Sequence, residues 1–203
     1  MHTVSEFQEK NRTQLFTMDE TLRTEGQSVL DRSGIGEIIH EAGFHPVGSF
    51  VMKTMTWRDL DFERYDENPS WDWHWELGRK LAGIDWIWSL HCNDSYRDPR
   101  TPGDYGYYWG LRVSDPTQKG NDFWKIDLWT ARKEEFEKSS PNCELWNSLM
   151  TDDKRHTILS IKEKIWDHPQ YRQTLLSVHI YEAVLEYDIA DIDNFWKWWQ
   201  TRY

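Results

Sequence analysis

The segment Val47–Glu63, VGSFVMKTMTWRDLDFE, determines which fold the chain is expected to adopt. Its last five residues, Asp59-Leu60-Asp61-Phe62-Glu63, alternate between acidic and apolar side chains, which is the period of a half-buried strand. Because successive side chains of a strand point to opposite faces, Asp59 and Asp61 share one face. Two carboxylates on one face repel each other unless a cation holds both in the charged form. The segment therefore predicts a strand that carries a cation site.

A glycine-serine bend precedes this strand. Residues Phe44 to Val47 fit a short strand that runs into Gly48-Ser49. A glycine lets another group approach the backbone closely, and the following amides and hydroxyl can hold a phosphate. The sequence thus predicts a phosphate-binding bend next to the acidic face.

A third acid lies on a later predicted strand. In WKIDLW, residues 124–129, the two aliphatic side chains share one face, which leaves Asp127 and Lys125 on the opposite face. If the two strands are neighbours, Asp127 meets Asp59 and Asp61. Magnesium, or manganese in its place, is the expected ion, because magnesium prefers oxygen ligands and binds one or two carboxylates together with substrate phosphates.

The rest of the chain predicts an α+β fold. We expect strands at 44–47, 59–63, 85–92, 105–113 and 123–130, and helices at 5–30, 35–42, 71–81, 152–166, 170–187 and 192–199. The polar stretch 93–104 contains proline and glycine and is expected to be a surface loop. The strands and N-terminal helices would form a core at 1–131, with a C-terminal helical region, 132–203, packed on it.

Composition limits the classes of partner and compartment. A net charge of -11 over 203 residues repels a phosphate backbone, so long nucleic acid is not an expected partner. Two cysteines, Cys92 and Cys143, are too few for a disulfide scaffold. No apolar run is long enough to cross a bilayer, and residues 1–10 lack the order of a secretion signal, so we expect no membrane partner and a cytoplasmic protein.

Together these motifs resemble the nucleotidyltransferase superfamily, whose fold is that of DNA polymerase β. The family's signature is a hydrophobic residue, Gly, Gly or Ser, a short spacer, Asp-x-Asp, and a third acid on another strand. Here it is matched by Val47-Gly48-Ser49, then Asp59-Leu60-Asp61, then Asp127. The match covers residues 44–130 and implies a nucleotidyltransferase-type mixed sheet flanked by helices. The chain departs from many members in having Lys53 and Arg58 in the intervening loop.

The resemblance implies transfer of a nucleoside monophosphate from a nucleoside triphosphate, ATP above all, to a hydroxyl of a small acceptor. Asp59, Asp61 and Asp127 would hold two magnesium ions and act as the catalytic residues. Nucleotide-binding residues would be Gly48, Ser49, Lys53 and Arg58. Antibiotic-modifying relatives suggest an aminoglycoside-like acceptor.

Three other functions fit parts of the pattern. The first is a toxin-like nucleotidyltransferase that modifies a protein. The second is an inactive member that binds a nucleotide or a partner. The third is a carbohydrate-binding module, which requires an exposed row of tryptophans drawn from Trp71, Trp73, Trp75, Trp86 and Trp88. Because Trp71 and Trp75 share a helical face, we expect them to pack in the core instead.

Overall fold

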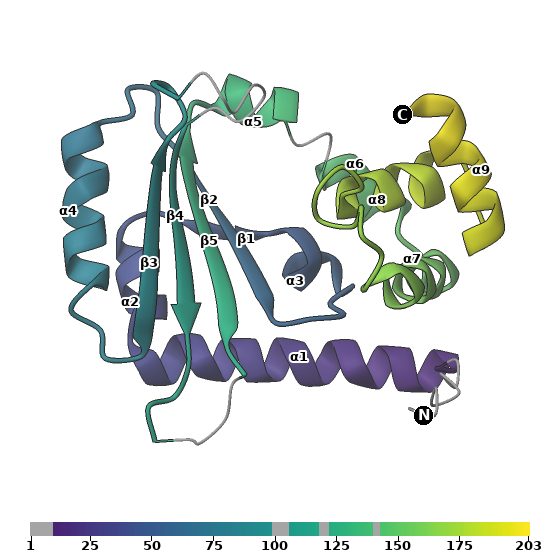
Figure 1. Ribbon diagram of the computed structural model, residues 1–203, viewed down its shortest axis with the longest axis horizontal. Helices are drawn as coiled ribbons and strands as arrows, with labels where there is room; N and C mark the ends of the chain where they lie inside the picture. Colours follow the sequence, from purple (N-terminus) through teal and green to yellow (C-terminus); the bar gives the residue numbers. More distant parts are fainter. Residues whose placement is uncertain (1–9, 99–105, 118–121, 140–142) are drawn as a thin grey trace.

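The computed structural model describes residues 10–98, 106–117, 122–139 and 143–203, and a five-stranded mixed sheet forms one side of it (Figure 1). The strands are β1 (His45–Val47), β2 (Asp59–Tyr65), β3 (Ile87–Asp94), β4 (Tyr107–Val113) and β5 (Trp124–Ala131). Their order across the sheet is β1-β2-β5-β4-β3. β2 and β5 are parallel, and the other neighbours are antiparallel. The α+β class and the helix-flanked sheet are therefore confirmed.

Three helices cover one face of the sheet: α1 (Arg12–Ser33), α2 (Ile35–Glu41) and α4 (Trp71–Leu81). Their apolar residues, such as Ile35 and Leu81, pack against strand residues such as Leu60 and Ile126 in one buried cluster. Burying each side chain of this size stabilises the fold by about 1.5–3 kcal/mol. The opposite face of the sheet, which carries the acids, is left for the rest of the chain.

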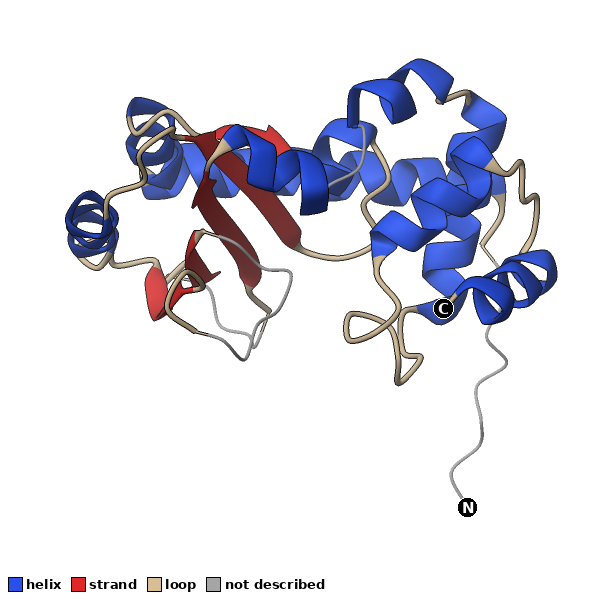
Figure 2. Cartoon of the chain, turned by 90° about the horizontal axis from the view of Figure 1, so that it is seen from above, coloured by secondary structure: helices blue, strands red, loops and turns tan. Residues whose placement is uncertain are grey.

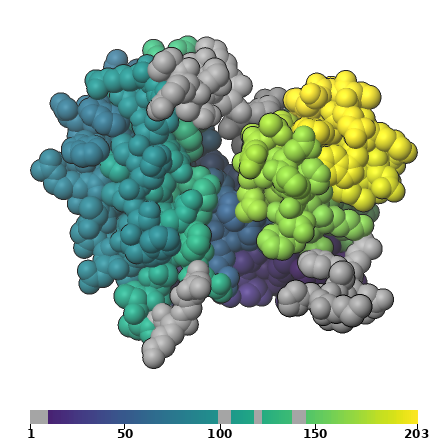
Figure 3. Space-filling model, in the orientation of Figure 1, coloured from purple at the N-terminus to yellow at the C-terminus, as the bar shows by residue number. Residues whose placement is uncertain are grey.

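A second group of helices has a core of its own. The group contains α6 (Cys143–Leu149), α7 (Asp152–Ile165), α8 (Ser177–Glu186) and α9 (Ile192–Arg202), whereas α5 (Lys133–Ser139) follows β5 and contacts the sheet, where Phe136 packs on Tyr65. Ile158 and Ile165 of α7 are buried with Ile180 and Val184 of α8 and Phe195 of α9. Figure 2 shows this helical part beside the sheet, and in Figure 3 the surface is hollowed between the two parts.

The sheet and the helical part are joined at the turn that follows α3 (Gly48–Met52). The carboxylate of Asp19 in α1 is fully buried and accepts hydrogen bonds from Met55 N at 2.8 Å and from Arg155 of α7 at 2.7 Å. Lys162 of α7 donates to the Thr54 carbonyl at 2.7 Å. Because buried polar groups are costly unless they are bonded, these contacts fix α7 relative to the strands.

Several predicted boundaries differ from the structure. The helix expected at 170–187 is wrong in its first part, because α8 begins at Ser177 and Arg172 has a φ of +66°, which a right-handed helix excludes. The first helix of the described residues begins at Arg12, and the start expected at residue 5 lies outside the described part of the chain. Ser70 caps α4 as expected, since its Oγ accepts a hydrogen bond from Trp73 N. Much of the loop expected at 93–104 also lies outside the described residues.

The tryptophans do not form an exposed row. Trp75 on α4 and Trp88 on β3 are exposed, whereas the other three in that set are half-buried. Trp71 stacks on the buried His74 at a ring distance of 5.8 Å. The structure thus contradicts the arrangement that a carbohydrate-binding module requires. Among the described helices, none is long and apolar enough to span a membrane.

Candidate metal and nucleotide site

The three acids meet where β2 and β5 run side by side. Asp61 lies directly opposite Asp127 in this parallel pair, and Asp59 is one pleat away on the same face. One carboxylate oxygen from each residue lies within 4.8 Å of the others. The alternation of acidic and apolar residues in the sequence predicts this shared face, and the structure brings the three side chains together on it.

Burial makes this cluster electrostatically costly. Burial raises the pKa of Asp59 well above its ordinary value, and the neighbouring Asp61 carboxylate raises it further. Burial raises the pKa of Asp61 to about 6, and the Asp127 carboxylate is the next largest cause. Carboxylates in such a place favour either a proton or a bound cation.

Two neighbouring side chains compensate part of that charge. Lys125 Nζ forms ion pairs with Asp127 Oδ2 at 2.5 Å and with Asp59 Oδ1 at 3.3 Å. The Tyr108 hydroxyl donates a hydrogen bond to Asp127 Oδ1 at 2.9 Å. Gly110 leaves room for this tyrosine, because a Cβ there would lie 2.3 Å from the Tyr108 hydroxyl. Asp127 is therefore held in place by β4 and β5 together.

The glycine-serine bend adjoins the acids, as the sequence predicts. Gly48 has a φ of +64°, a conformation that favours glycine. A Cβ at this position would lie 3.0 Å from Asp61 Oδ2, so the missing side chain also lets the carboxylate approach the backbone. Ser49 lines the same pocket as Asp59 and Asp61.

The helical part closes this pocket, which has a volume of about 320 Å³. Lys162, Ser177 and Tyr181 line it from α7 and α8. Lys162 is 1% exposed, and burial lowers the pKa of its ammonium to about 8, although Asp59 and Asp61 act in the opposite direction. The pocket thus has an acidic wall on the sheet and a buried cation on the opposite side.

Sequence reasoning missed Lys162, although the chain contains a signal for it. Lys162 lies four residues after Ile158 and three before Ile165, so it belongs to the apolar face of α7. A lysine on such a face is rarely buried without a partner or a function. The signal becomes specific only when the face is known to pack toward the acids.

The structure does not bring Lys53 or Arg58 to the acidic pocket. Lys53 ends α3 in a left-handed conformation with a φ of +56°, and its side chain is exposed. Arg58 forms ion pairs with Glu25 and Asp122, both at 3.2 Å, and lines a different pocket. Lys125 and Lys162 are the basic side chains nearest the acids among the described residues that line or contact this pocket.

The donor set fits magnesium. All three candidate ligands are carboxylates, and the buried Asp59 Oδ1 has only the Lys125 ammonium, at 3.3 Å, as its ion-pair partner among the described residues. Magnesium prefers such oxygen ligands and keeps positions for water and phosphate oxygens. Asp59, Asp61 and Asp127 could therefore hold the ion, with Lys125 competing for two of them.

Comparison with known proteins identifies no relative. No family model matches the chain, and no curated protein or solved structure matches it either.

Proposed function

We propose that the chain is a metal-dependent nucleotidyltransferase that transfers a nucleoside monophosphate from a triphosphate, ATP above all, to a hydroxyl of a small molecule. The observation that carries the proposal is the meeting of Asp59, Asp61 and Asp127 beside the Gly48-Ser49 bend. The chain order of this bend, Asp-x-Asp strand and parallel third-acid strand is similar to the core of the nucleotidyltransferase superfamily.

Different residues of the pocket would bind the outer phosphates, the metal ion and the acceptor hydroxyl. Ser49 and Lys162 would bind the β- and γ-phosphates, since a buried ammonium binds phosphate strongly. Asp59 and Asp61 would hold magnesium, which supplies charge neutralisation of the phosphates when bound. Asp127 would orient the acceptor hydroxyl and take its proton.

In the reaction, the acceptor oxygen forms a bond to the α-phosphorus. The bond from that phosphorus to the bridging oxygen breaks, and pyrophosphate leaves with the electron pair. The chain's own contribution is to position the two reactants and to stabilise the charge on the leaving group.

The test combines a melting assay with a transfer assay. Magnesium with ATP should raise the melting temperature of the parent, because a ligand that binds the folded state alone stabilises it. Label from α-labelled ATP should then move to a compound in a metabolite panel or to a protein in a cell lysate, and the second result would indicate the protein-modifying alternative. Asp61→Asn should abolish the effects of magnesium with ATP, whereas Asp85→Asn, which removes an exposed acid, should behave like the parent. The proposal is refuted if neither magnesium nor manganese, added with ATP, raises the melting temperature of the parent. It is also refuted if Asp61→Asn responds to magnesium and ATP as the parent does.

A second candidate is a binding-only domain, and one observation favours it. The Lys125 ammonium already contacts Asp59 and Asp127, where an active enzyme would place a divalent cation. Such a domain predicts that ATP raises the melting temperature equally in magnesium and in EDTA, with no label transfer. An active enzyme predicts that EDTA removes most of the shift.

A further inference from the structure

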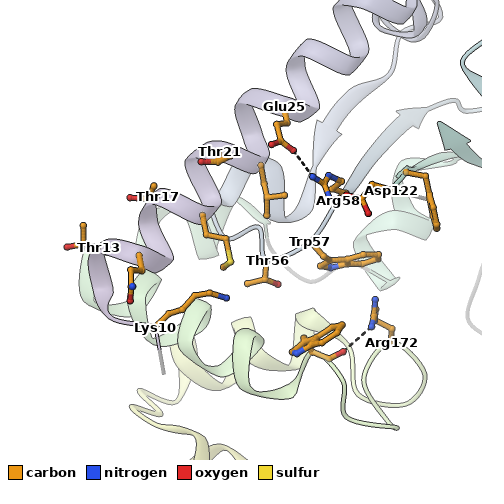
Figure 4. Close-up of a pocket in the computed structure, with 15 residues that line it drawn as sticks. Lys10, Thr13, Thr17, Thr21, Glu25, Thr56, Trp57, Arg58, Asp122 and Arg172 are labelled. Carbon is orange, nitrogen blue, oxygen red and sulfur yellow. Dashed lines mark hydrogen bonds and ion pairs between the residues drawn. The ribbon is translucent and has the colours of Figure 1, made fainter. Parts of the chain in front are cut away.

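A larger pocket lies next to the acidic one. It has a volume of about 970 Å³ and is bounded by α1, by residues 56–58, by residues 122–123 just before β5 and by the segment that follows α7 (Figure 4). Trp57 lines both pockets, and its ring centroid lies 5.6 Å from Lys125 Nζ, which contacts the acids. The two cavities are therefore neighbours across a single indole side chain.

Arg172 is the unusual residue of the larger pocket. Its backbone φ of +66° is a left-handed conformation that is unfavourable for a residue other than glycine. Its guanidinium lies over the Trp57 ring at 4.7 Å, and Nη2 donates to the Trp166 carbonyl at 3.0 Å. Strain of this kind persists where the surroundings enforce it, and it is concentrated at ligand sites.

The guanidinium of Arg172 also differs from the other cations of this pocket in its partners. Arg58 is paired with two carboxylates, and Lys10 is paired with Glu163 at 2.8 Å. Within the described residues, no carboxylate forms an ion pair with Arg172. A guanidinium has five N–H donors in a planar fork that fits a phosphate or carboxylate.

We propose that the larger pocket binds the acceptor, and that this acceptor is a hydroxyl compound that carries a phosphate or carboxylate group, which Arg172 recognises. The inference rests on the proposed nucleotidyltransferase function. Aromatic and aliphatic side chains, Trp57, Phe123, Trp166 and Leu22, supply the surface for the body of the acceptor. Its hydroxyl reaches Asp127 past Trp57. The lining acids Glu25 and Asp122 are paired with Arg58, and Lys10 is paired with Glu163, so the charge of Arg172 is the one left without a carboxylate partner among the described lining residues. This charge disfavours an aminoglycoside, which is itself cationic.

The test compares acceptor panels with and without negative charge. Glucose 6-phosphate, ribose 5-phosphate and glucuronate form one panel, and glucose and kanamycin form the other. We expect anionic compounds alone to raise the parent's melting temperature without ATP, and to accept label from α-labelled ATP with magnesium. Arg172→Gly should raise the KM for the anionic acceptor about 10- to 100-fold, as loss of a charge-assisted contact does. The melting shift with magnesium and ATP should remain parental in this variant.

Two control variants separate recognition from folding. Arg172→Gly also relieves the backbone strain, so its own melting temperature should be equal to or above that of the parent. Asp188→Gly makes the same backbone change at a φ of +53° outside both pockets and should leave the KM unchanged. Arg172→Lys keeps the charge but loses the planar fork, and should give an intermediate KM.

The outcomes distinguish the inference from the function on which it rests. If label moves to uncharged or cationic acceptors, or if Arg172→Gly keeps the parental KM, the inference is overturned and the nucleotidyltransferase proposal stands. If no anionic compound binds or is labelled while magnesium and ATP still raise the melting temperature, the inference alone is again overturned. If magnesium and ATP have no effect on the parent, both fail.

Discussion

Replacing Lys162 by methionine tests how the pocket's buried cation affects stability. Methionine keeps most of the volume of the lysine stem but removes the ammonium. In the parent the ammonium is fully buried and donates to the Thr54 carbonyl. It also lies 3.4 Å from the Tyr181 hydroxyl, which has a second contact with Thr54 Oγ1 at 2.9 Å. The substitution therefore removes a buried charge and leaves one carbonyl without its donor.

The magnitude follows from the pKa of Lys162, which burial lowers from 10.5 to about 8. This difference corresponds to about 3 kcal/mol of unfavourable free energy for the charged form in the folded protein at pH 7. Loss of the donor to Thr54 costs about 1–3 kcal/mol in the variant. Lys162→Met should therefore be as stable as the parent at pH 7, or more stable by about 1–2 kcal/mol.

The pH dependence gives a sharper measurement than a single value. Between pH 8 and 10.5 the unfolded chain keeps the Lys162 proton and the folded protein has lost it, so the parent's stability rises with pH in this window. Relative to Lys162→Met, the parent should gain about 3 kcal/mol across it. Urea unfolding of both proteins in EDTA measures the difference, and Lys164→Met, an exposed position on the same helix, serves as the control.

Two results would refute this reasoning. A difference between parent and Lys162→Met that stays constant from pH 8 to 10.5 would mean that the ammonium is not buried as described. A destabilisation of more than about 3 kcal/mol at pH 7 would mean that the lysine stabilises the fold, as one partner of a well-compensated buried pair does. Either result would mean that the Lys162 ammonium does not destabilise the folded protein. If the account is right, the same variant should show a smaller melting shift with ATP.

Three further predictions concern other positions. Gly48→Ala should weaken the melting shift with magnesium and ATP and cost about 1–2 kcal/mol, because alanine is strained at positive φ and its Cβ meets Asp61 Oδ2; thermal melting with and without ligand measures both effects. Burial lowers the pKa of His74 to about 4, so the folded protein excludes a proton that the unfolded chain binds below pH 6.5, and the parent loses stability as the pH falls from 6.5 to 4. His74→Phe should lose about 3 kcal/mol less than the parent over this range, measured by urea unfolding. Asp19→Ala should cost about 3–5 kcal/mol by urea unfolding, since it leaves the half-buried guanidinium of Arg155 without its carboxylate and the buried Met55 amide without its acceptor, and an Asp19→Ala protein within about 1 kcal/mol of the parent would contradict this.

The strands were largely predictable, and the reason is local. Period-two alternation at 59–63 and at 124–129 indicates both strands and the face that carries Asp59, Asp61 and Asp127, so the three acids are expected to meet if the two strands are neighbours. The parallel pairing of β2 with β5 is not a local property, and alternation alone does not reveal it. The residues of this site are thus predictable because they occupy alternate positions on two strands of the sheet.

The basic residues could not be predicted in the same way. Lys53 and Arg58 are near the Gly-Ser bend in sequence, but a left-handed residue and an ion pair with Glu25 direct them elsewhere. Lys162 is more than a hundred residues from the bend and reaches the pocket only because α7 packs on the turn that contains Thr54. Arg172 was placed in a helix, because periodicity does not reveal a residue with a positive φ inside a tight turn.

The chain contains two kinds of buried charge, and the difference between them indicates where function lies. Asp19 accepts hydrogen bonds from one backbone amide and two arginines, so its buried carboxylate is compensated. Asp59 and Asp61, by contrast, are buried beside each other with raised pKa values, and the nearby Lys162 has a lowered one. A fold has no reason to retain acids and a cation in such unfavourable states for stability alone, since apolar residues of similar volume would be more stable there. Both perturbations would become favourable if the proposed divalent cation and triphosphate were bound, because the ion would stabilise the carboxylates and the phosphates would stabilise the ammonium.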